Sequence, residues 1–587
     1  MRTSESTPLS LHVQHATALF CVSASLSLCL LGGCSVLRDP FVPRDDDYAR
    51  SLALSRLREV PAANYTDNRA PAVDLNNRQT VIDAVTANRM SYLARERVDL
   101  TIEDCRRSAI ENNLDLKVSL IDPAIARETV TEEDNKFNSL FSLEASYNDS
   151  RQSTGSRVST QGTKRFTIEP SIRIPSRTGT TIDVVPLRLE HTEQQSEFAE
   201  QPQFISLGPS VSISQPLLRG AGRRVNMAAL RIAGYNVQSA ELRTKLELIR
   251  QLSDVDRAYW RLYAARTTLD VRVQQFELAQ AQLEKARRRV QEGLSPQVEV
   301  DRALSGVAQR LEGMLLAQND VLSRQRDLKR IINKPDLPID AEALVVPSSP
   351  PDPVEYLFDR TQLQEQAVAN RAELLDLEVQ LAADAARVLL ERDGTLPDVR
   401  FLASYGFSGL DEKPGSAIDS MFDQQSRAWS IGASISTPLD NEEARARLRR
   451  ALLTRVQRLT SKQAREQTVR VEVLTAIDNM TTSWQRILAA RQAALTAAVA
   501  LDSEQRQFDL GRVTSTDVLD QASVVAEAQL AEVNALADYQ IAQIDLAVAT
   551  GTLMGATKVD LDHTPLININ DADPTEEVPG QLNTPQR

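Results

Sequence analysis

The sequence predicts a mainly α-helical protein that also contains a two-faced membrane β-sheet and is built from two repeats of one unit. A chain of 587 residues exceeds the size at which one compact core stops growing, ~250–300 residues. Only 21 residues are Gly, and abundant Ala, Leu, Gln, Arg and Glu favour helix. Two pairs of similar segments occur in the same order in both halves: 212–217 (SISQPL) with 434–439 (SISTPL), and 293–300 with 511–518.

Each repeat contains one very long helix. The stretches 220–291 and 440–510 contain no Pro and almost no Gly, and each would extend roughly 105 Å at 1.5 Å per residue. In the second stretch, apolar residues alternate spacings of four and three, which is the narrow stripe of a coiled coil. These residues are Val473, Ile477, Met480, Trp484 and Ile487.

Shorter helices accompany the long ones. Helical patterns cover 101–136 and 297–333 in the first half, and 361–393 and 514–550 in the second. Thr101 and Thr361 open two of them as N-cap candidates. Two short helices together match the length of one long helix, so we expect them to stack end to end along it.

Strictly alternating segments predict the strands. Small polar residues alternate with aliphatic or aromatic ones over about 138–150, 204–215, 398–408 and 429–437. A half-buried soluble sheet gives the same pattern, but 137–214 and 395–437, about a fifth of the chain, hold 11 of its 26 aromatic residues, as membrane-interface girdles would. Four strands cannot close a barrel, and an open edge in lipid leaves backbone groups unpaired. The barrel wall must therefore be shared between protomers.

Residues 163–190 look like an extra hairpin around Ser176–Thr180. The sequence leaves open whether this hairpin enlarges the barrel or forms an outer loop.

The remaining segments are a targeting signal, a linker between the repeats and two polar terminal segments. Residues 1–33 resemble a bacterial lipoprotein signal peptide, in which an apolar run at 16–31 is followed by Gly32-Gly33 and Cys34. An ordinary signal peptide that merely contains a Cys is the alternative. Residues 34–98 and the acidic tail 557–587 are expected to be irregular, and 335–358 is a Pro-rich linker between the repeats at 99–334 and 359–556.

Composition argues against several functions. The net charge of −13 argues against a nucleic-acid partner. Four Cys and four His, mostly scattered or near the N-terminus, assemble no metal site and no nucleophile–base pair, so we expect no enzyme activity, no metal and no cofactor.

These repeats resemble the outer-membrane efflux factor (TolC) family from about residue 100 to 556. The shared features are the paired strands and long helices, the strand ends Pro216-Leu217 and Pro438-Leu439, and the Gly turns at helix tips. The resemblance implies a homotrimer in the outer membrane, with four strands per protomer forming a 12-stranded β-barrel continued by a 12-helix α-barrel. It also implies passive conduction from an inner-membrane pump reached through a periplasmic adaptor.

The resemblance assigns roles to residues at the helix tips. Asp517 and Asp520, with Glu299 in the first repeat, would line a narrow aperture as carboxylate rings, whose mutual repulsion raises their pKa. Acidic residues also favour any helix N-terminus, which is the alternative. The adaptor would dock on the turns Gly293-Leu294-Ser295 and Gly511-Arg512-Val513-Thr514, although plain helix termination explains these residues too.

Phe508 and Val513 stand where members of the family often carry a Tyr and an Arg that bond neighbouring helices in the closed state. Neither side chain can donate such bonds, so any lock here must use other contacts.

Two functions of different classes fit the sequence. One is an export duct for small molecules or secreted polypeptide, and the other is a coiled-coil lipoprotein that braces the outer membrane without conducting. The barrel-type strands and paired Gly turns favour the duct, because a brace needs neither. The sequence identifies neither the cargo nor the class of pump.

We predict that Cys34 is acylated. Growth with a radioactive fatty acid should label the wild type and leave Cys34→Ser unlabelled, because the thiol is the acceptor. An unlabelled wild-type protein would contradict the lipobox interpretation. The variant should stay membrane-associated, since the barrel would hold it independently.

Overall fold

A computed structural model of the chain describes residues 91–92, 94–151, 162–195, 202–423 and 426–557. The chain divides into two compact units, and almost all described residues belong to the unit Ala94–Ile567. Its first half contains β1 (Arg97–Leu100), α4 (Ile102–Asn112), α5 (Leu114–Asn135), β2 (Leu140–Arg151), β3 (Gly162–Pro175), β4 (Thr181–Gln195), β5 (Gln203–Pro216), α6 (Arg223–Asn226), α7 (Ala228–Gln291) and α8 (Val298–Ile332). The second half contains β6 (Leu344–Pro347), α9 (Arg360–Asn370), α10 (Ala372–Asp393), β7 (Asp398–Asp411), α11 (Pro414–Phe422), β8 (Ser426–Ser436), α12 (Glu442–Asp509), α13 (Ser515–Ala549) and α14 (Leu553–Thr557).

Several expectations concern residues outside this description. The signal peptide 1–33, Cys34, nearly all of the segment 34–98 and the tail beyond 557 lie outside the described residues. Among the residues that are described, no helix has both the length and the apolar character needed to cross a membrane.

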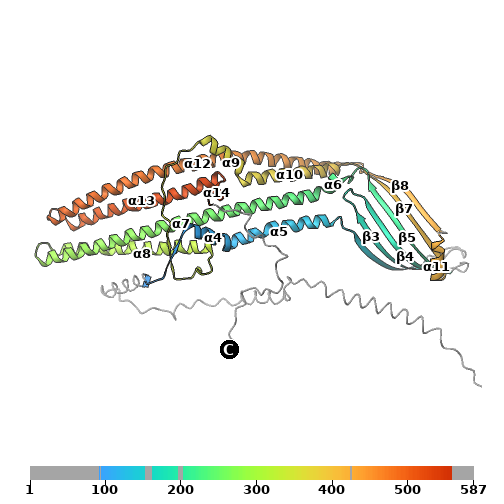
Figure 1. Cartoon of the computed structure of the whole chain (residues 1–587), viewed down its shortest axis with the longest axis horizontal. Helices are drawn as coiled ribbons and strands as arrows, with labels where there is room; N and C mark the ends of the chain where they lie inside the picture. Colours follow the sequence, from blue (N-terminus) through green and yellow to red (C-terminus); the bar gives the residue numbers. More distant parts are fainter. Residues whose placement is uncertain (1–90, 93, 152–161, 196–201, 424–425, 558–587) are drawn as a thin grey trace, which may run out of the picture. The chain divides into compact units, whose positions relative to one another are not determined.

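The two halves repeat the same helical plan. Helices of 11 and 22 residues (α4 and α5, α9 and α10) precede the strands, a helix of 64 or 68 residues (α7 or α12) follows them, and a 35-residue helix (α8 or α13) ends each repeat. Along α7 lie α5 and then α8, and along α12 lie α10 and then α13 (Figure 1). Two short helices therefore cover one long helix, as the length match predicted.

A single extended residue interrupts the helix before the strands in each repeat. Asn113 separates α4 from α5 with φ −61° and ψ 126°, and Arg371 separates α9 from α10 with φ −68° and ψ 120°. The Asn113 side chain accepts from Leu116 N–H at 2.9 Å and donates to the carbonyl of Ile331 at 2.9 Å. The continuous helices expected over 101–136 and 361–393 are wrong at these two residues. The Asn113 side chain caps the helix that follows, whereas Arg371 makes no side-chain cap and bonds to neighbouring helices instead.

The N-cap of one helix also differs from the expectation. Thr101 caps α4 as predicted, since its side chain accepts from Asp104 N–H at 3.1 Å. At α9, however, the cap is Asp359, whose carboxylate accepts from Thr361 N–H at 2.9 Å. Thr361 is therefore inside the helix and not its cap.

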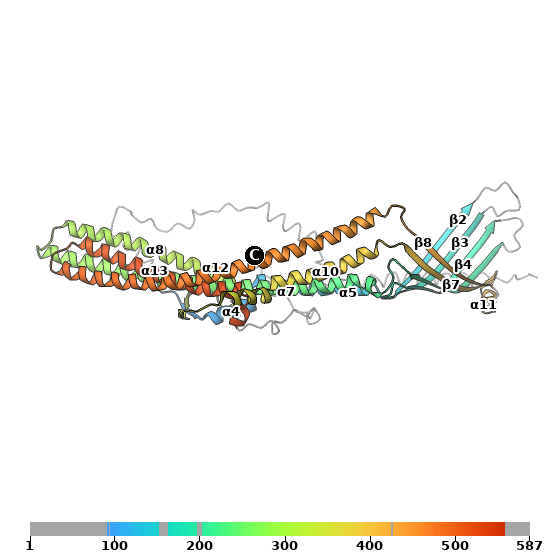
Figure 2. The same cartoon turned by 90° about the horizontal axis from the view of Figure 1, so that it is seen from above.

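Six strands form one antiparallel sheet in the order β2-β3-β4-β5-β7-β8. Figures 1 and 2 both show this sheet at one end of the long helices, opposite the helix tips. The expectation of four strands per protomer is wrong, because the hairpin β3–β4 joins the sheet between β2 and β5.

Two small elements have no counterpart in the expectations. β1 pairs in parallel with β6, so the Pro-rich segment after α8 carries a strand that the composition did not indicate. The helix α11, between β7 and β8, packs Ala417 and Met421 on Leu207 of β5. Leu207 is only 5% exposed, so α11 covers part of one face of the sheet at the end remote from the long helices (Figure 2).

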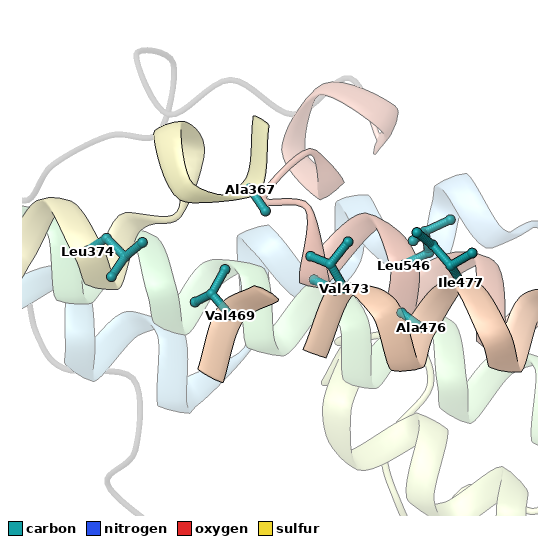
Figure 3. Close-up of a cluster of buried hydrophobic side chains, with 8 residues drawn as sticks. Ala367, Leu374, Val469, Val473, Ala476, Ile477 and Leu546 are labelled. Atoms are coloured by element: carbon teal, nitrogen blue, oxygen red, sulfur yellow. The ribbon is translucent and has the colours of Figure 1, made fainter. Parts of the chain in front are cut away.

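The stripe predicted on α12 is the seam of its packing. Val473, Ile477 and Met480 are at most 2% exposed, and Trp484 lies against the Tyr539 ring with centroids 5.9 Å apart. Figure 3 shows Val473 and Ile477 with residues from three other helices, namely Ala367, Leu374 and Leu546. Small and aliphatic side chains let these helices approach closely, so the contacts run along a narrow line.

Arg371 ties three helices together at the break in the second repeat. Its guanidinium donates to Glu472 on α12 at 2.7 Å and to the carbonyl of Ala549 on α13 at 3.1 Å, and it also bonds Glu373 on its own helix. Burial alone would raise the pKa of Glu373, but hydrogen bonds from Arg371 and Arg465 hold it below its usual range. The cluster is therefore charged and paired where the helices meet.

We predict that Arg371→Met destabilises the protein by about 1–3 kcal/mol, since it removes the donor to the Ala549 carbonyl and leaves Arg465 alone to pair Glu373 and Glu472. Thermal unfolding followed by far-ultraviolet circular dichroism measures the loss. Arg360→Met is the matched control, because Arg360 and Asp478 form an exposed pair (61% and 60% exposed) worth at most about 1 kcal/mol.

The difference in the free energy of unfolding between wild type and Arg371→Met should depend on pH. A lowered pKa at Glu373 stabilises the fold above the unfolded pKa of about 4.3 and loses that contribution as pH falls through the folded value. The gap between the two proteins should therefore narrow on acidification below about pH 4. Equal losses in Arg371→Met and Arg360→Met would contradict this account.

Candidate functional site

The two helix tips have the same backbone geometry. Gly293 and Gly511 adopt φ of 74° and 73°, the left-handed region that favours Gly. In the first tip Leu294 N–H donates to the Arg289 carbonyl at 2.8 Å, and in the second Arg512 N–H donates to the Gln507 carbonyl at 3.0 Å. Each long helix thus ends in a Schellman turn, which reverses the chain into the next helix.

Exposed residues lie on both turns, where the adaptor-docking residues were predicted. Leu294 is 65% exposed and Leu510, beside the second turn, is 70% exposed, while Ser295 is half-buried and Arg512 is exposed. Of the remaining docking candidates, Gly293, Gly511 and Thr514 are exposed and Val513 is half-buried. The turns therefore present apolar side chains to the surroundings of the chain.

Asp517 takes part in the capping box at the start of α13, where Thr514 is the N-cap. Its carboxylate accepts from Thr514 N–H at 2.7 Å and from the Thr514 hydroxyl at 2.7 Å, while Thr514 Oγ1 accepts from Asp517 N–H at 3.3 Å. This capping box lowers the pKa of Asp517, chiefly through the hydroxyl hydrogen bond. Within one chain the shift is opposite to the rise expected from carboxylate repulsion, because the cap donors stabilise the charged form.

Asp520 and Glu299 lie in different surroundings. Asp520 is exposed one turn after Asp517. The side chain of Glu299 is 15% exposed, accepts from Arg302 at 2.9 Å and receives the Ser515 N–H at 3.4 Å. Glu299 therefore joins the first tip to the start of α13, whereas Asp520 takes no part in the capping box of that helix.

A cluster of charged and aromatic residues holds the two tips together. The ring of Phe508, on α12, lies under Lys285 Nζ at 5.2 Å and Arg289 Cζ at 5.0 Å, both on α7. Arg289 also donates to the Phe508 carbonyl at 3.0 Å, and Lys285 pairs with Asp509. Phe508 is only 6% exposed, so the ring fills the space between the helices.

This tip clamp, formed by Lys285, Arg289, Phe508 and Asp509, contains groups that the sequence analysis did not assign. The sequence indicates only that Phe508 cannot donate a hydrogen bond. It accepts cation–π contacts instead, and each contributes about 0.5–2 kcal/mol depending on exposure. No spacing pattern links positions more than two hundred residues apart, so only the parallel course of α7 and α12, which end side by side at the tips, brings the clamp together.

Among the described residues, no cluster of three or more His, Cys, Asp or Glu side chains is placed to hold a metal ion. Cys105 is a buried free thiol, and burial with nearby Asp104 and Asp256 raises its pKa to about 12.

Comparison with known proteins identifies the family. The family model described as "Outer membrane efflux protein" matches residues 185–334 and 363–552, which together are more than half of the chain. The chain belongs to the outer membrane efflux protein family. It is an outer-membrane protein that extends into the periplasm.

Individual relatives of this family agree. The chain is 26% identical over 308 residues to outer membrane protein TolC of Escherichia coli K12, a match that covers 50% of this chain and 60% of that protein. The Campylobacter jejuni CmeC outer membrane channel has a TM-score of 0.59 at 14% identity, over 78% of this chain and 90% of that one. Vibrio cholerae VceC has a TM-score of 0.56 at 17% identity, over 77% and 96%. The two solved structures share the fold.

We predict that Phe508→Leu loosens the tip clamp. Leu keeps an apolar side chain but removes the π face, so backbone amides at the end of α12, such as those of Leu510 and Gly511, should exchange with solvent about fivefold faster for each ~1 kcal/mol lost. Hydrogen-exchange mass spectrometry measures this. Phe508→Tyr retains the ring and should exchange at the wild-type rate; identical behaviour of the two variants would rule out a cation–π contribution.

Proposed function

We propose that three copies of this chain form a duct that passively conducts small molecules or secreted polypeptide across the periplasm and outer membrane. An inner-membrane pump supplies the energy and a periplasmic adaptor docks on the exposed helix tips. The observation that carries the proposal is the sheet, which has two free edges and one exposed apolar face.

The free edges require partners. The strands β2 and β8 end the six-stranded sheet, and every residue of both is exposed. The outer edge of each strand presents unpaired N–H and C=O groups, which cost several kcal/mol apiece in lipid. Since β2 and β8 run in opposite directions, β8 of one copy can pair antiparallel with β2 of the next.

One face of the sheet suits lipid. Exposed apolar residues repeat at every second position of the edge strands, with exposed fractions of 58–73%: Phe141, Leu143, Tyr147, Trp429, Ile431 and Ile435. The opposite face carries small polar side chains, such as Ser404 and Ser430, which are joined at 2.8 Å. An apolar outside and a polar inside are the requirements of a barrel with a wet lumen.

The helices supply the periplasmic part of the duct. Each chain presents four helical columns, since α5 with α8, α7, α10 with α13, and α12 lie alongside one another. Three copies would give the twelve columns of an α-barrel. A brace without a lumen would need neither a two-faced sheet nor two matched helix tips, which favours the duct over the structural alternative.

The aperture carboxylates Asp517 and Asp520 provide the test. In planar bilayers the wild type should form cation-selective channels that multivalent cations block, because three copies of each carboxylate concentrate negative charge in a narrow passage. We predict that Asp517→Ala/Asp520→Ala loses both selectivity and block. The single variant Asp520→Ala, which leaves the capping box intact, should lose part of each.

Glu442→Ala/Glu443→Ala is the matched control. It removes two carboxylates from the first turn of α12, which is the end of α12 opposite the helix tip where Asp517 and Asp520 lie. This variant should conduct with wild-type selectivity. Absence of any channel in the wild type would overturn the proposed function, whereas full selectivity in Asp517→Ala/Asp520→Ala would place the aperture elsewhere.

A further inference from the structure

The hairpin β3–β4 is an integral part of the sheet. β2 pairs along its whole length with β3, β3 with β4, and β4 with β5. β2 has no direct pairing with β5, so the sheet is continuous only through the hairpin. The two strands have 14 and 15 residues, which exceeds the ~9–11 residues that a tilted membrane-spanning strand needs. The family match begins at residue 185, inside β4, so β3 lies outside it.

The hairpin continues both faces of the sheet. Its pairing places Ile168 and Ile172 on the same side as Ala145 and Phe141 of β2, and Ile182 and Val184 follow on that side. The other side of the hairpin carries Thr167 and Ser171, and Ser171 is joined to Ser142 of β2 at 2.7 Å. An outer loop would have no reason to keep an apolar side in register with the apolar side of the wall.

The polar face of the hairpin is charged. Its cross-strand pairs are Arg173–Asp183 at 2.7 Å, Arg165–Glu190 at 2.9 Å and Arg188–Glu169 at 3.3 Å. Three guanidinium groups thus pair with three carboxylates, so the polar face of the hairpin is charged and hydrated but has no net charge. Elsewhere on this face β5 and β8 present mainly Ser and Gly. In a membrane barrel the paired charged side chains of the hairpin would face water, because a charge on the lipid face costs about 2–4 kcal/mol near the bilayer midplane.

The hairpin turn is docked where strands meet helices. Gly179 has φ 92°, and a Cβ there would lie 2.4 Å from the Gly220 carbonyl oxygen. Gly222 N–H donates to the Thr178 carbonyl at 2.9 Å, and Arg177 donates to Asp134, near the end of α5, at 2.8 Å. The turn therefore fills the gap between the start of β2 and the end of β5 at the junction with the helices.

We propose that β3 and β4 span the membrane, so that the assembled channel has an 18-stranded barrel whose lumen carries three charge-paired ladders and admits bulky hydrophilic cargo. The inference rests on the proposed trimeric duct. With a strand spacing of ~4.8 Å and a tilt of ~40°, the barrel diameter is about 36 Å, against about 24 Å for twelve strands. The cross-section is therefore roughly twice as large.

Cysteine labelling tests where the hairpin faces. Ser171→Cys and Asp183→Cys should react with a charged, water-soluble thiol reagent, and Ile172→Cys and Val184→Cys only with a lipid-soluble one. The native Cys105 gives little background, since it is 1% exposed and burial raises its pKa to about 12. The parent protein is the blank.

A matched pair on an edge strand separates this inference from the proposed duct. Ser142→Cys and Leu143→Cys should show the same alternation on β2. Alternation on β2 without alternation on β3 and β4 would make the hairpin an outer loop and overturn the inference alone. Loss of alternation on both would overturn the barrel itself.

Unpairing the ladder gives an electrical readout. In Asp183→Asn/Glu190→Gln, Arg165 and Arg173 lose their carboxylates, so three copies should shift the reversal potential toward anions. Glu193→Gln is the control, because Glu193 lies on the apolar side near the outer end of the same strand. A shift equal to that of Glu193→Gln would mean that the ladder does not face the lumen.

Polymer exclusion measures the width. Polyethylene glycol added to the external side samples the barrel without passing the periplasmic aperture. Polymers with a hydrodynamic radius of about 9 Å should enter and reduce conductance, since 16–18-stranded barrels leave a broad aqueous channel. Exclusion of all polymers above about 6 Å would indicate a barrel near twelve strands and contradict the proposal.

Discussion

The need to pair every backbone hydrogen-bonding group inside a membrane governs this protein. A sheet of six strands leaves one edge at β2 and another at β8. Lipid offers no donors or acceptors, so both edges need strands from elsewhere. The alternation of the two faces and the strand lengths follow from this need, and in the proposed assembly the helices hold the edges at a fixed position relative to neighbouring copies.

The long helices need packing partners along their whole length. Each long helix, of 64 or 68 residues, is covered by two shorter helices placed end to end along it. The joints between them require residues that leave the helical conformation and still satisfy their neighbours. Asn113 does so with an amide, and Arg371 with a guanidinium shared among three helices. The repeats thus keep the same plan with different chemistry.

Charge is used differently at the two ends of the described unit. At the helix tips, cations on α7 lie over the Phe508 ring, and acidic residues begin α13. On the polar face of the hairpin, opposite charges alternate across strands and cancel. The first arrangement binds two helices and leaves Asp520 exposed, whereas the second hydrates a surface without attracting ions of either sign.

The sequence by itself determined the features that depend on residues close together in the chain. Hydrophobic periodicity predicted the helices and strands, and Gly residues marked both tips. Alternation of polar and apolar residues distinguished the two faces of the sheet. Each of these signals depends on neighbours within a few residues. Tertiary structure alone decided the place of 163–190 in the sheet, the pairing of β1 with β6, the breaks at Asn113 and Arg371, and the tip clamp. Each of these joins residues far apart in the chain, and the free energy of such contacts has no periodic signature in the sequence.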